Sequence, residues 1–174
     1  MKTKLLTLVS AIALLFAGCK GDQGDPGAQG PEGNANVLGT QFAVTDASWS
    51  DNNGDYTVDL TVPALTSDIA SGGAVETFLS QDGGTTWIAL PFTTVASNSE
   101  NAFWNYAYST GSVTVALLWN GADNGSPNAF YNVNTLDINV VCIAPATMKK
   151  YPNTNWKDYN VVKSILQLQN NSSK

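Results

Sequence analysis

The stretch Tyr56-Thr57-Val58-Asp59-Leu60-Thr61-Val62 decides the fold class, because apolar and polar side chains alternate along it without a break. Successive side chains of an extended strand point to opposite faces, so this alternation predicts a strand with one buried face and one face in water. The same period of two returns in residues 113–119 and 136–142. We therefore expect an all-β domain.

Further segments predict strands, and turn-forming residues separate them. The segments are Gln41–Ser50, Ala74–Ser80, Thr86–Phe92 and Phe103–Ser109. Runs rich in Gly, Asn, Asp and Ser lie between them, as at residues 51–55, 82–84, 109–112 and 121–128. About seven short strands with regular turns predict an antiparallel β-sandwich over residues 36–148, with a short helical turn inside Pro63–Gly73.

Residues 149–174 change period. Apolar side chains recur there at helical spacing, at Tyr159, Val162, Ile165 and Leu166. The pattern predicts a C-terminal α-helix with Asn155 as its N-cap. We expect this helix to pack across an open end or edge of the sandwich, where it would shield strand edges.

The first 18 residues have the layout of a lipoprotein signal peptide. A basic start is followed by the apolar run Leu5–Phe16 and by Ala17-Gly18-Cys19. The run is shorter than the roughly 20 residues that span a bilayer, and small residues before a cysteine are typical of a lipobox. We predict that Cys19 becomes the first residue and the lipid attachment site, so that the protein is held to a membrane. An ordinary secretory signal with a chance cysteine is the alternative.

Residues 19–35 follow as a collagen-like spacer. Consecutive Gly-X-Y triplets occupy residues 21–35, with Pro26 and Pro31 in Y and X positions. Glycine at every third position is what a triple helix requires, because only a hydrogen atom fits at its axis. Two interpretations stay open. We favour an extended tether of a single chain, and the alternative is a short triple helix in a homotrimer.

Charge excludes several classes of partner. The chain has no His and no Arg, carries a net charge of −6, and has no cation between Gly21 and Thr147. Nucleic acids require clustered Lys and Arg, so we expect no nucleic-acid partner. Without His, a Ser-His-Asp triad or an imidazole zinc site cannot form, and we expect no cofactor, no metal site and no catalytic residue. Cys142 is expected to be a buried, inert thiol.

One motif resembles the Asp-box of sialidases and related β-propellers. It is Ser80-Gln81-Asp82-Gly83-Gly84-Thr85-Thr86-Trp87, with Ser80, Asp82, Gly84 and Trp87 as the matching positions. In the Asp-box the aspartate fixes the turn of a β-hairpin and the tryptophan packs beneath it. The chain holds one copy and lacks the arginines that bind sialic acid. We therefore predict a structural hairpin here.

Three other patterns offer weaker chemistry. Trp104, Tyr106 and Tyr108 share one face of a predicted strand and could stack on sugar rings, although core packing is favoured. Glu76 and Glu100 are the candidate carboxylates for a glycosidase, which is the weakest hypothesis. Residues 51–55 and 121–128 carry oxygen ligands that calcium could use, and a turn is the preferred interpretation of the first.

The whole layout resembles the collagen-like surface lipoproteins of Bacteroidetes. The lipobox and the triplets carry this resemblance, together with Ala70–Val75, Trp87–Pro91 and Asn155–Val162. It implies an outer-membrane lipoprotein at the cell surface with a β-rich domain of no established activity. We expect a non-catalytic protein with a structural, adhesive or scaffolding role and an unidentified protein or glycan partner. The alternative is a carbohydrate-binding module of a polysaccharide uptake system.

Overall fold

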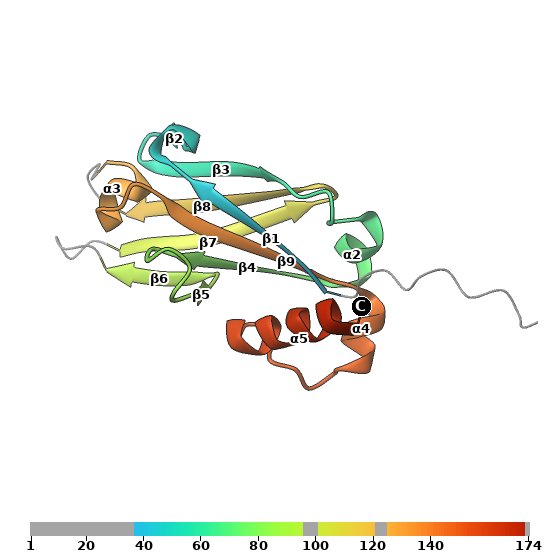
Figure 1. The fold of residues 1–174 in the computed structure, drawn as a ribbon. Coiled ribbons are helices and arrows are strands. Elements are labelled where there is room, and N and C mark those ends of the chain that lie inside the picture. Colours follow the sequence, from blue (N-terminus) through green and yellow to red (C-terminus); the bar gives the residue numbers. More distant parts are fainter. Residues whose placement is uncertain (1–36, 96–100, 121–124, 173–174) are drawn as a thin grey trace, which may run out of the picture. The chain divides into compact units, whose positions relative to one another are not determined.

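The computed structural model describes residues 37–95, 101–120 and 125–172, and it confirms an antiparallel β-sandwich with a C-terminal helix (Figure 1). Within these residues the strands form a four-stranded sheet of order β1-β9-β4-β5 and a five-stranded sheet of order β2-β3-β8-β7-β6. The predicted signal peptide, Cys19 and the Gly-X-Y triplets lie outside the described residues.

The elements have the following bounds. The strands are β1 (Val37–Val44), β2 (Ser50–Asn52), β3 (Asp55–Thr61), β4 (Ala74–Ser80), β5 (Ile88–Ala89), β6 (Phe92–Val95), β7 (Asn101–Ser109), β8 (Ser112–Asn120) and β9 (Leu136–Ile143). The helices are η2 (Asp46–Ser48), α2 (Ser67–Gly72), α3 (Pro127–Tyr131), α4 (Pro145–Lys150) and α5 (Tyr159–Ser172), of which η2 is a 3₁₀-helix.

Strand β9 is the centre of the four-stranded sheet. It pairs with β1 on one side and with β4 on the other, and every residue except Asp137 is buried. Leu136, Ile138, Val140 and Cys142 face the other sheet, as their period of two predicts. Val141 and Ile143 point to the opposite face and belong to a second apolar cluster. Both faces of β9 are therefore covered, which explains its nearly continuous apolar sequence.

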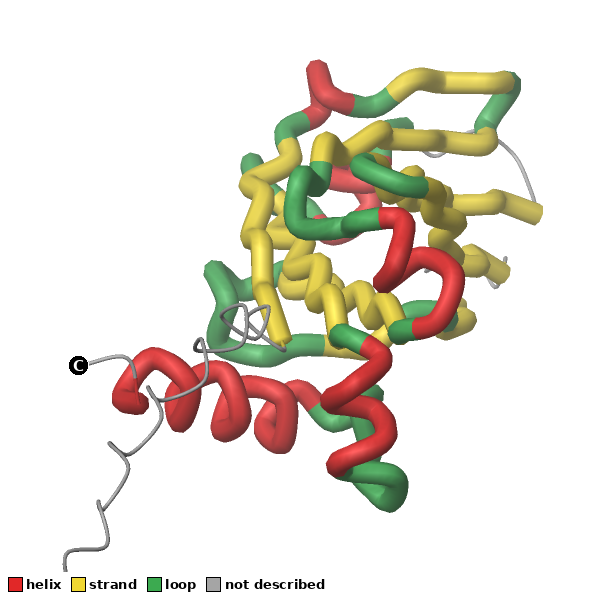
Figure 2. Tube along the Cα trace, turned by 90° about the vertical axis from the view of Figure 1, so that its right-hand side faces the viewer, coloured by secondary structure: helices red, strands yellow, loops and turns green. Residues whose placement is uncertain are grey.

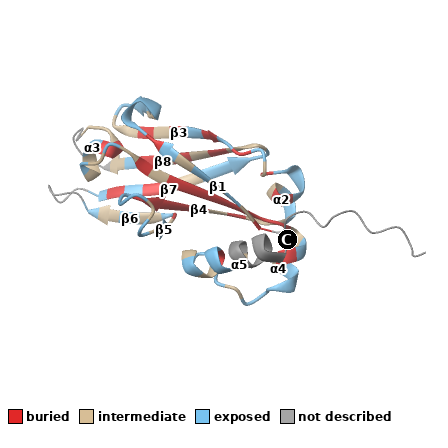
Figure 3. Ribbon diagram, viewed as in Figure 1, coloured by how far each residue is buried: buried red, intermediate tan, exposed pale blue. Residues whose placement is uncertain are grey.

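The five-stranded sheet buries only its inner face. Val113, Val115 and Leu117 of β8 have no exposed surface, whereas Leu118 on the other face is 40% exposed. Buried and more exposed residues alternate along β3, as its sequence predicts, and Val58 and Leu60 are among the buried ones. Figure 3 shows buried segments along β4 and β7, one strand of each sheet.

Two predicted strands differ from the observed ones. Gln41–Ser50 is not one strand, because β1 already ends at Val44 and η2 follows, closed by a hydrogen bond from the Ser48 N–H to the Thr45 carbonyl. The segment Thr86–Phe92 divides between β5 and β6, which belong to different sheets. Pro91 lies between them after a cis peptide bond and has no N–H for a ladder.

The C-terminal helix packs on the outer face of the four-stranded sheet, not across an open end of the sandwich, and it contacts β1, an edge strand of that sheet. Trp156 and Val162 are buried against Val37, Phe78 and Ile143 on the outer face of the four-stranded sheet. Figure 2 shows this helical segment outside the strands.

The predicted N-cap of this helix is also corrected. Helix α5 begins at Tyr159, and the Asp158 carboxylate accepts a hydrogen bond from the Asn160 N–H at 2.9 Å. Asn155 lies upstream of the helix and accepts from the Lys157 N–H at 3.3 Å.

Helices α3 and α4 are not part of the sequence-based expectation. Ser126 caps α3 by accepting a hydrogen bond from the Ala129 N–H, and Pro127 occupies its first turn. Pro145 occupies the first turn of α4 in the same way. Both helices are too short for a periodic apolar pattern to show in the sequence.

In the part of the chain that the structure describes, no helix is long and apolar enough to cross a membrane.

Candidate functional site

The Asp-box-like residues form the turn between β4 and β5. The Ser80 hydroxyl donates to the Asp82 carboxylate at 2.8 Å and accepts from the Gly84 N–H at 2.9 Å. The same carboxylate oxygen accepts from the N–H groups of Thr85 and Thr86, at 3.1 and 2.8 Å. These contacts hold a loop whose two glycines have positive φ angles, +67° at Gly83 and +80° at Gly84.

The Asp82 carboxylate is ionised at neutral pH. The backbone hydrogen bond from Thr86 is the main reason, with further hydrogen bonds from the side chains of Thr86 and Ser80, and together they lower the pKa of Asp82 to about 2. The carboxylate is exposed, so its hydrogen bonds organise the turn without burying a charge.

Trp87 connects this turn to α5. Its indole N–H donates to the Gly84 carbonyl at 2.9 Å, and a Cβ at Gly84 would stand 3.3 Å from the indole ring. The ring stacks on Tyr159 with centroids 4.9 Å apart and an interplanar angle of 28°. Tyr159 in turn meets the edge of Phe78 at 5.1 Å and accepts a hydrogen bond from the Asn139 amide at 2.9 Å. The turn and the helix are thus fixed to each other and to the sheet.

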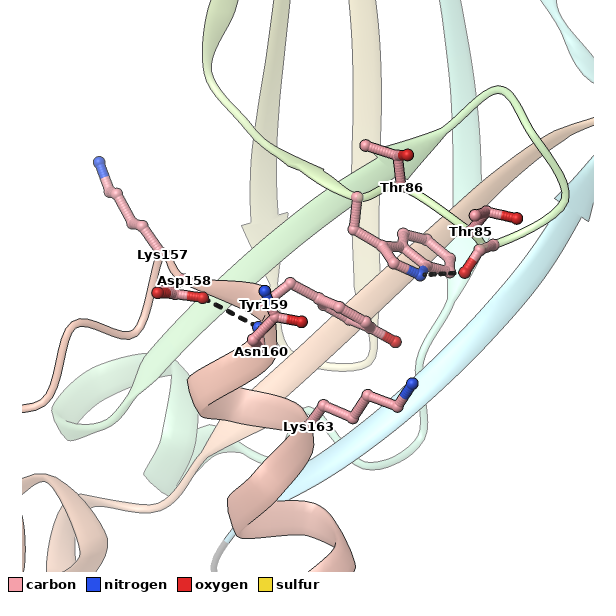
Figure 4. A pocket seen from close by; sticks show the side chains of 9 residues that line it. Thr85, Thr86, Lys157, Asp158, Tyr159, Asn160 and Lys163 are labelled. Carbon is pink, nitrogen blue, oxygen red and sulfur yellow. Dashed lines mark hydrogen bonds between the residues drawn. The ribbon is translucent and has the colours of Figure 1, made fainter.

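A groove of about 300 Å³ lies between the turn and the N-terminal part of α5. Its lining residues are Gly84, Thr85, Thr86, Trp87, Lys157, Asp158, Tyr159, Asn160 and Lys163. Figure 4 shows Lys163 extending from the helix beside Tyr159, whose ring stacks on Trp87. Lys157 stands at the other side of Asp158 and points away from the rings.

The groove offers positive charge and hydroxyl groups. Lys157 and Lys163 are exposed, and so are Thr85 and Thr86. Tyr159 covers one face of the half-buried Trp87 ring, and the Gly84 carbonyl takes up the indole N–H. The arrangement can therefore hold an anionic or hydroxyl-rich group by charge and hydrogen bonds.

The predicted sugar-stacking row on β7 does not form a platform. Trp104 has no exposed surface and packs between the rings of Phe92 and Tyr131, with centroids 6.2 and 6.0 Å away. The Tyr106 hydroxyl donates to the Val75 carbonyl of the opposite sheet at 2.7 Å. Tyr108 is 44% exposed and lies stacked against Tyr106. Trp104 and Tyr106 therefore pack toward the interior, as the core-packing interpretation predicts, whereas Tyr108 is exposed, and Trp104 is excluded as a ligand contact.

The remaining candidates are the two glutamates, the possible calcium loops and Cys142. Burial raises the pKa of Glu76, an effect that the nearby Lys157 ammonium opposes, and Glu100 lies outside the described residues. Asp51 accepts a hydrogen bond from the Gly54 N–H at 2.9 Å in the turn between β2 and β3. Among the described residues no group of three or more His, Cys, Asp or Glu side chains could hold a metal ion. Burial raises the pKa of Cys142 to about 11, so it is a thiol at neutral pH.

The sequence pointed to the turn that forms one side of the groove, but not to the segment around Lys157 and Lys163 that forms the other side. The motif pointed to residues 80–87, but nothing local to Lys157 or Lys163 indicates that they face that turn. The available local signal was Trp87, a large aromatic side chain beside the turn that would be expected to pack against another segment. No family model, curated protein or solved structure matches this chain.

Proposed function

We propose that this protein is a lipid-anchored, non-catalytic component of the cell surface whose β-sandwich is presented to structural or adhesive partners. The observation that carries the proposal is the order Leu5–Phe16, Ala17-Gly18-Cys19 and Gly-X-Y triplets ahead of the domain. An exported lipoprotein of the outer membrane is the class of protein that needs an anchor, a spacer and then a folded module.

The domain is suited to such a role. It has a continuous apolar core between two sheets, and a second cluster joins its C-terminal helix to the outer face of one sheet. Neither cluster depends on a disulfide, since the described cysteine, Cys142, is free and buried. Extensive burial can therefore hold the module together at the end of a spacer.

The anchor is tested by replacing the acceptor thiol. Metabolic palmitate labelling of the full chain should be lost in Cys19→Ser, with Cys142→Ser as the matched control because it removes the other cysteine. Equal labelling of Cys19→Ser and the wild type would overturn the lipid anchor.

The oligomeric state separates the two interpretations of the spacer. We expect the mature chain, with Cys19 replaced by Ser, to be a monomer by multi-angle light scattering, because five triplets give a triple helix little to build on. A trimer that becomes a monomer when residues 21–35 are deleted would instead make the triplets an assembly element and favour multivalent adhesion.

Glycan binding is the second candidate, and the groove beside Trp87 supports it better than β7 does. Two lysines and two threonines line this groove, which suits an acidic polysaccharide. We expect binding in a glycan screen to be weakened by Lys163→Gln and kept by Lys163→Arg, which retains the charge at the same position. Equal binding by wild type and Lys163→Gln would remove the groove as the site. Trp104→Ala is unsuitable as a test, because it would disturb the core.

A further inference from the structure

The charges of the domain are segregated along the chain. The lysines that the structure describes are Lys149, Lys150, Lys157 and Lys163, all in the C-terminal segment. The described acidic residues before this segment are Asp46, Asp51, Asp55, Asp59, Asp68, Glu76, Asp82 and Asp137. The sandwich is therefore acidic, and its positive charge is concentrated where α4 leads into α5.

This basic segment also presents an aromatic side chain and irregular backbone. Lys149 and Lys150 end α4 and are exposed, and Tyr151, Pro152 and Asn153 follow as exposed residues. The Lys150 ammonium lies 5.2 Å from the centre of the Tyr151 ring, which is 40% exposed. We call residues 149–153 the basic corner. Figure 1 shows that the connection between α4 and α5 projects beyond the strands.

The described chain begins next to the same helices. Val37, the first residue of β1, is buried in one cluster with Trp156 and Val162. The β2–β3 hairpin lies at the other end of the sandwich (Figure 1). Cys19 precedes Val37 by 18 positions, so an anchor there would be attached at the end of the domain that carries the lysines.

We propose that the basic corner is a docking surface for the anionic headgroups of the membrane that holds the anchor. The inference rests on the lipid anchor of the proposed function. Each lysine near an anionic bilayer adds attraction that falls off within a Debye length, and an interfacial tyrosine suits the headgroup region. The acidic sandwich would be repelled by the same surface. Attraction and repulsion therefore act together to orient the domain with β2 and β3 away from the membrane.

Lysine footprinting on vesicles tests this orientation. The full lipidated chain is reconstituted in phosphatidylcholine vesicles with or without phosphatidylglycerol, treated with a water-soluble amine-acylating reagent and read residue by residue by mass spectrometry. Asn52→Lys supplies a reference amine in the exposed β2–β3 hairpin. We expect Lys149 and Lys150 to be acylated roughly tenfold more slowly than the reference on the anionic vesicles, with high salt removing the difference.

Charge variants separate attraction from burial. Lys157, the next lysine along the chain, should also be protected on anionic vesicles. Lys149→Arg/Lys150→Arg should keep this protection, and Lys149→Gln/Lys150→Gln should remove it. Equal acylation of Lys149, Lys150 and the reference amine on both kinds of vesicle would overturn the docking surface. Flotation of the chain with phosphatidylcholine vesicles reports the anchor separately. If the chain floats but Lys149 and Lys150 are not protected, only the docking surface is overturned. If the chain does not float, both the anchor and the docking surface are overturned.

Discussion

The two sheets use the same alternating sequence in different ways. Strands β4 and β9 of the four-stranded sheet carry buried residues on both faces, under the other sheet and under the segment around α5, whereas the five-stranded sheet is covered only on its inner face. Phe78 and Phe103 illustrate the difference, because both point outward from their sheets. Phe78 has no exposed surface, and Phe103 is 37% exposed. An outward position in the sequence is thus a surface position at Phe103 and a core position at Phe78.

The largest expected effect compares these two phenylalanines. Phe78→Ala should lower the free energy of unfolding by roughly 3–5 kcal/mol, because it opens a cavity between the sheet and Tyr159. Phe103→Ala should cost less than about 1 kcal/mol, since its ring is already in contact with water. Chemical denaturation of both variants measures the difference. Equal losses would show that the outer faces of the two sheets are equally covered.

Removing single hydroxyl groups from Tyr159 and Tyr106 should have smaller effects on stability. Tyr159→Phe removes the acceptor of the buried Asn139 amide and should cost about 1–3 kcal/mol. Tyr106→Phe removes a donor to the Val75 carbonyl between the sheets, and about 1 kcal/mol is expected there. The same denaturation measurement applies. No loss in Tyr159→Phe would mean that the helix is held to the sheet by its apolar contacts alone.

The pH dependence of the β4–β5 turn is a smaller effect. The folded-state pKa of Asp82 is lowered from 3.8 to about 2, so its stabilising contribution is complete above pH 4 and is lost as the pH falls toward 2. The difference in unfolding free energy between wild type and Asp82→Asn should therefore shrink over this interval. A difference that is constant from pH 5 to pH 2 would contradict the hydrogen-bonded carboxylate.

Glu76 should give the smallest effect and the opposite sign. Burial raises its folded-state pKa above 4.5, so the folded protein loses stability as the pH rises from the unfolded-state pKa through the raised value. One carboxylate oxygen, Oε2, is buried without a hydrogen-bond partner. Glu76→Gln should consequently be slightly more stable than wild type at pH 7 and indistinguishable from it at pH 3. Lower stability of the variant at pH 7 would show that attraction to Lys157 outweighs the cost of burial.

Local patterns predicted the strands well and their surroundings poorly. The phase of Val58 and Leu60 followed from their own neighbours in sequence, because the side-chain period of a strand is a property of the backbone. The bonds of Asp82 reach no further than four residues along the chain, so a short motif could predict them. The cap of α5 was misplaced by three residues, from Asp158 to Asn155, since both side chains can cap a helix.

Sequence by itself determined the all-β class, the inward phase of the central strands and the turn at Asp82, since each depends on residues close in the chain. Only the tertiary structure decided that Phe78, Val141 and Ile143 are buried on the outer face of the four-stranded sheet and that Trp104 is enclosed by Phe92 and Tyr131. It likewise brought Lys163 to the groove beside Trp87. Each of these facts depends on a contact between segments far apart in the chain. The local sequence of one segment does not predict its partner, because burial depends on what the folded chain places nearby.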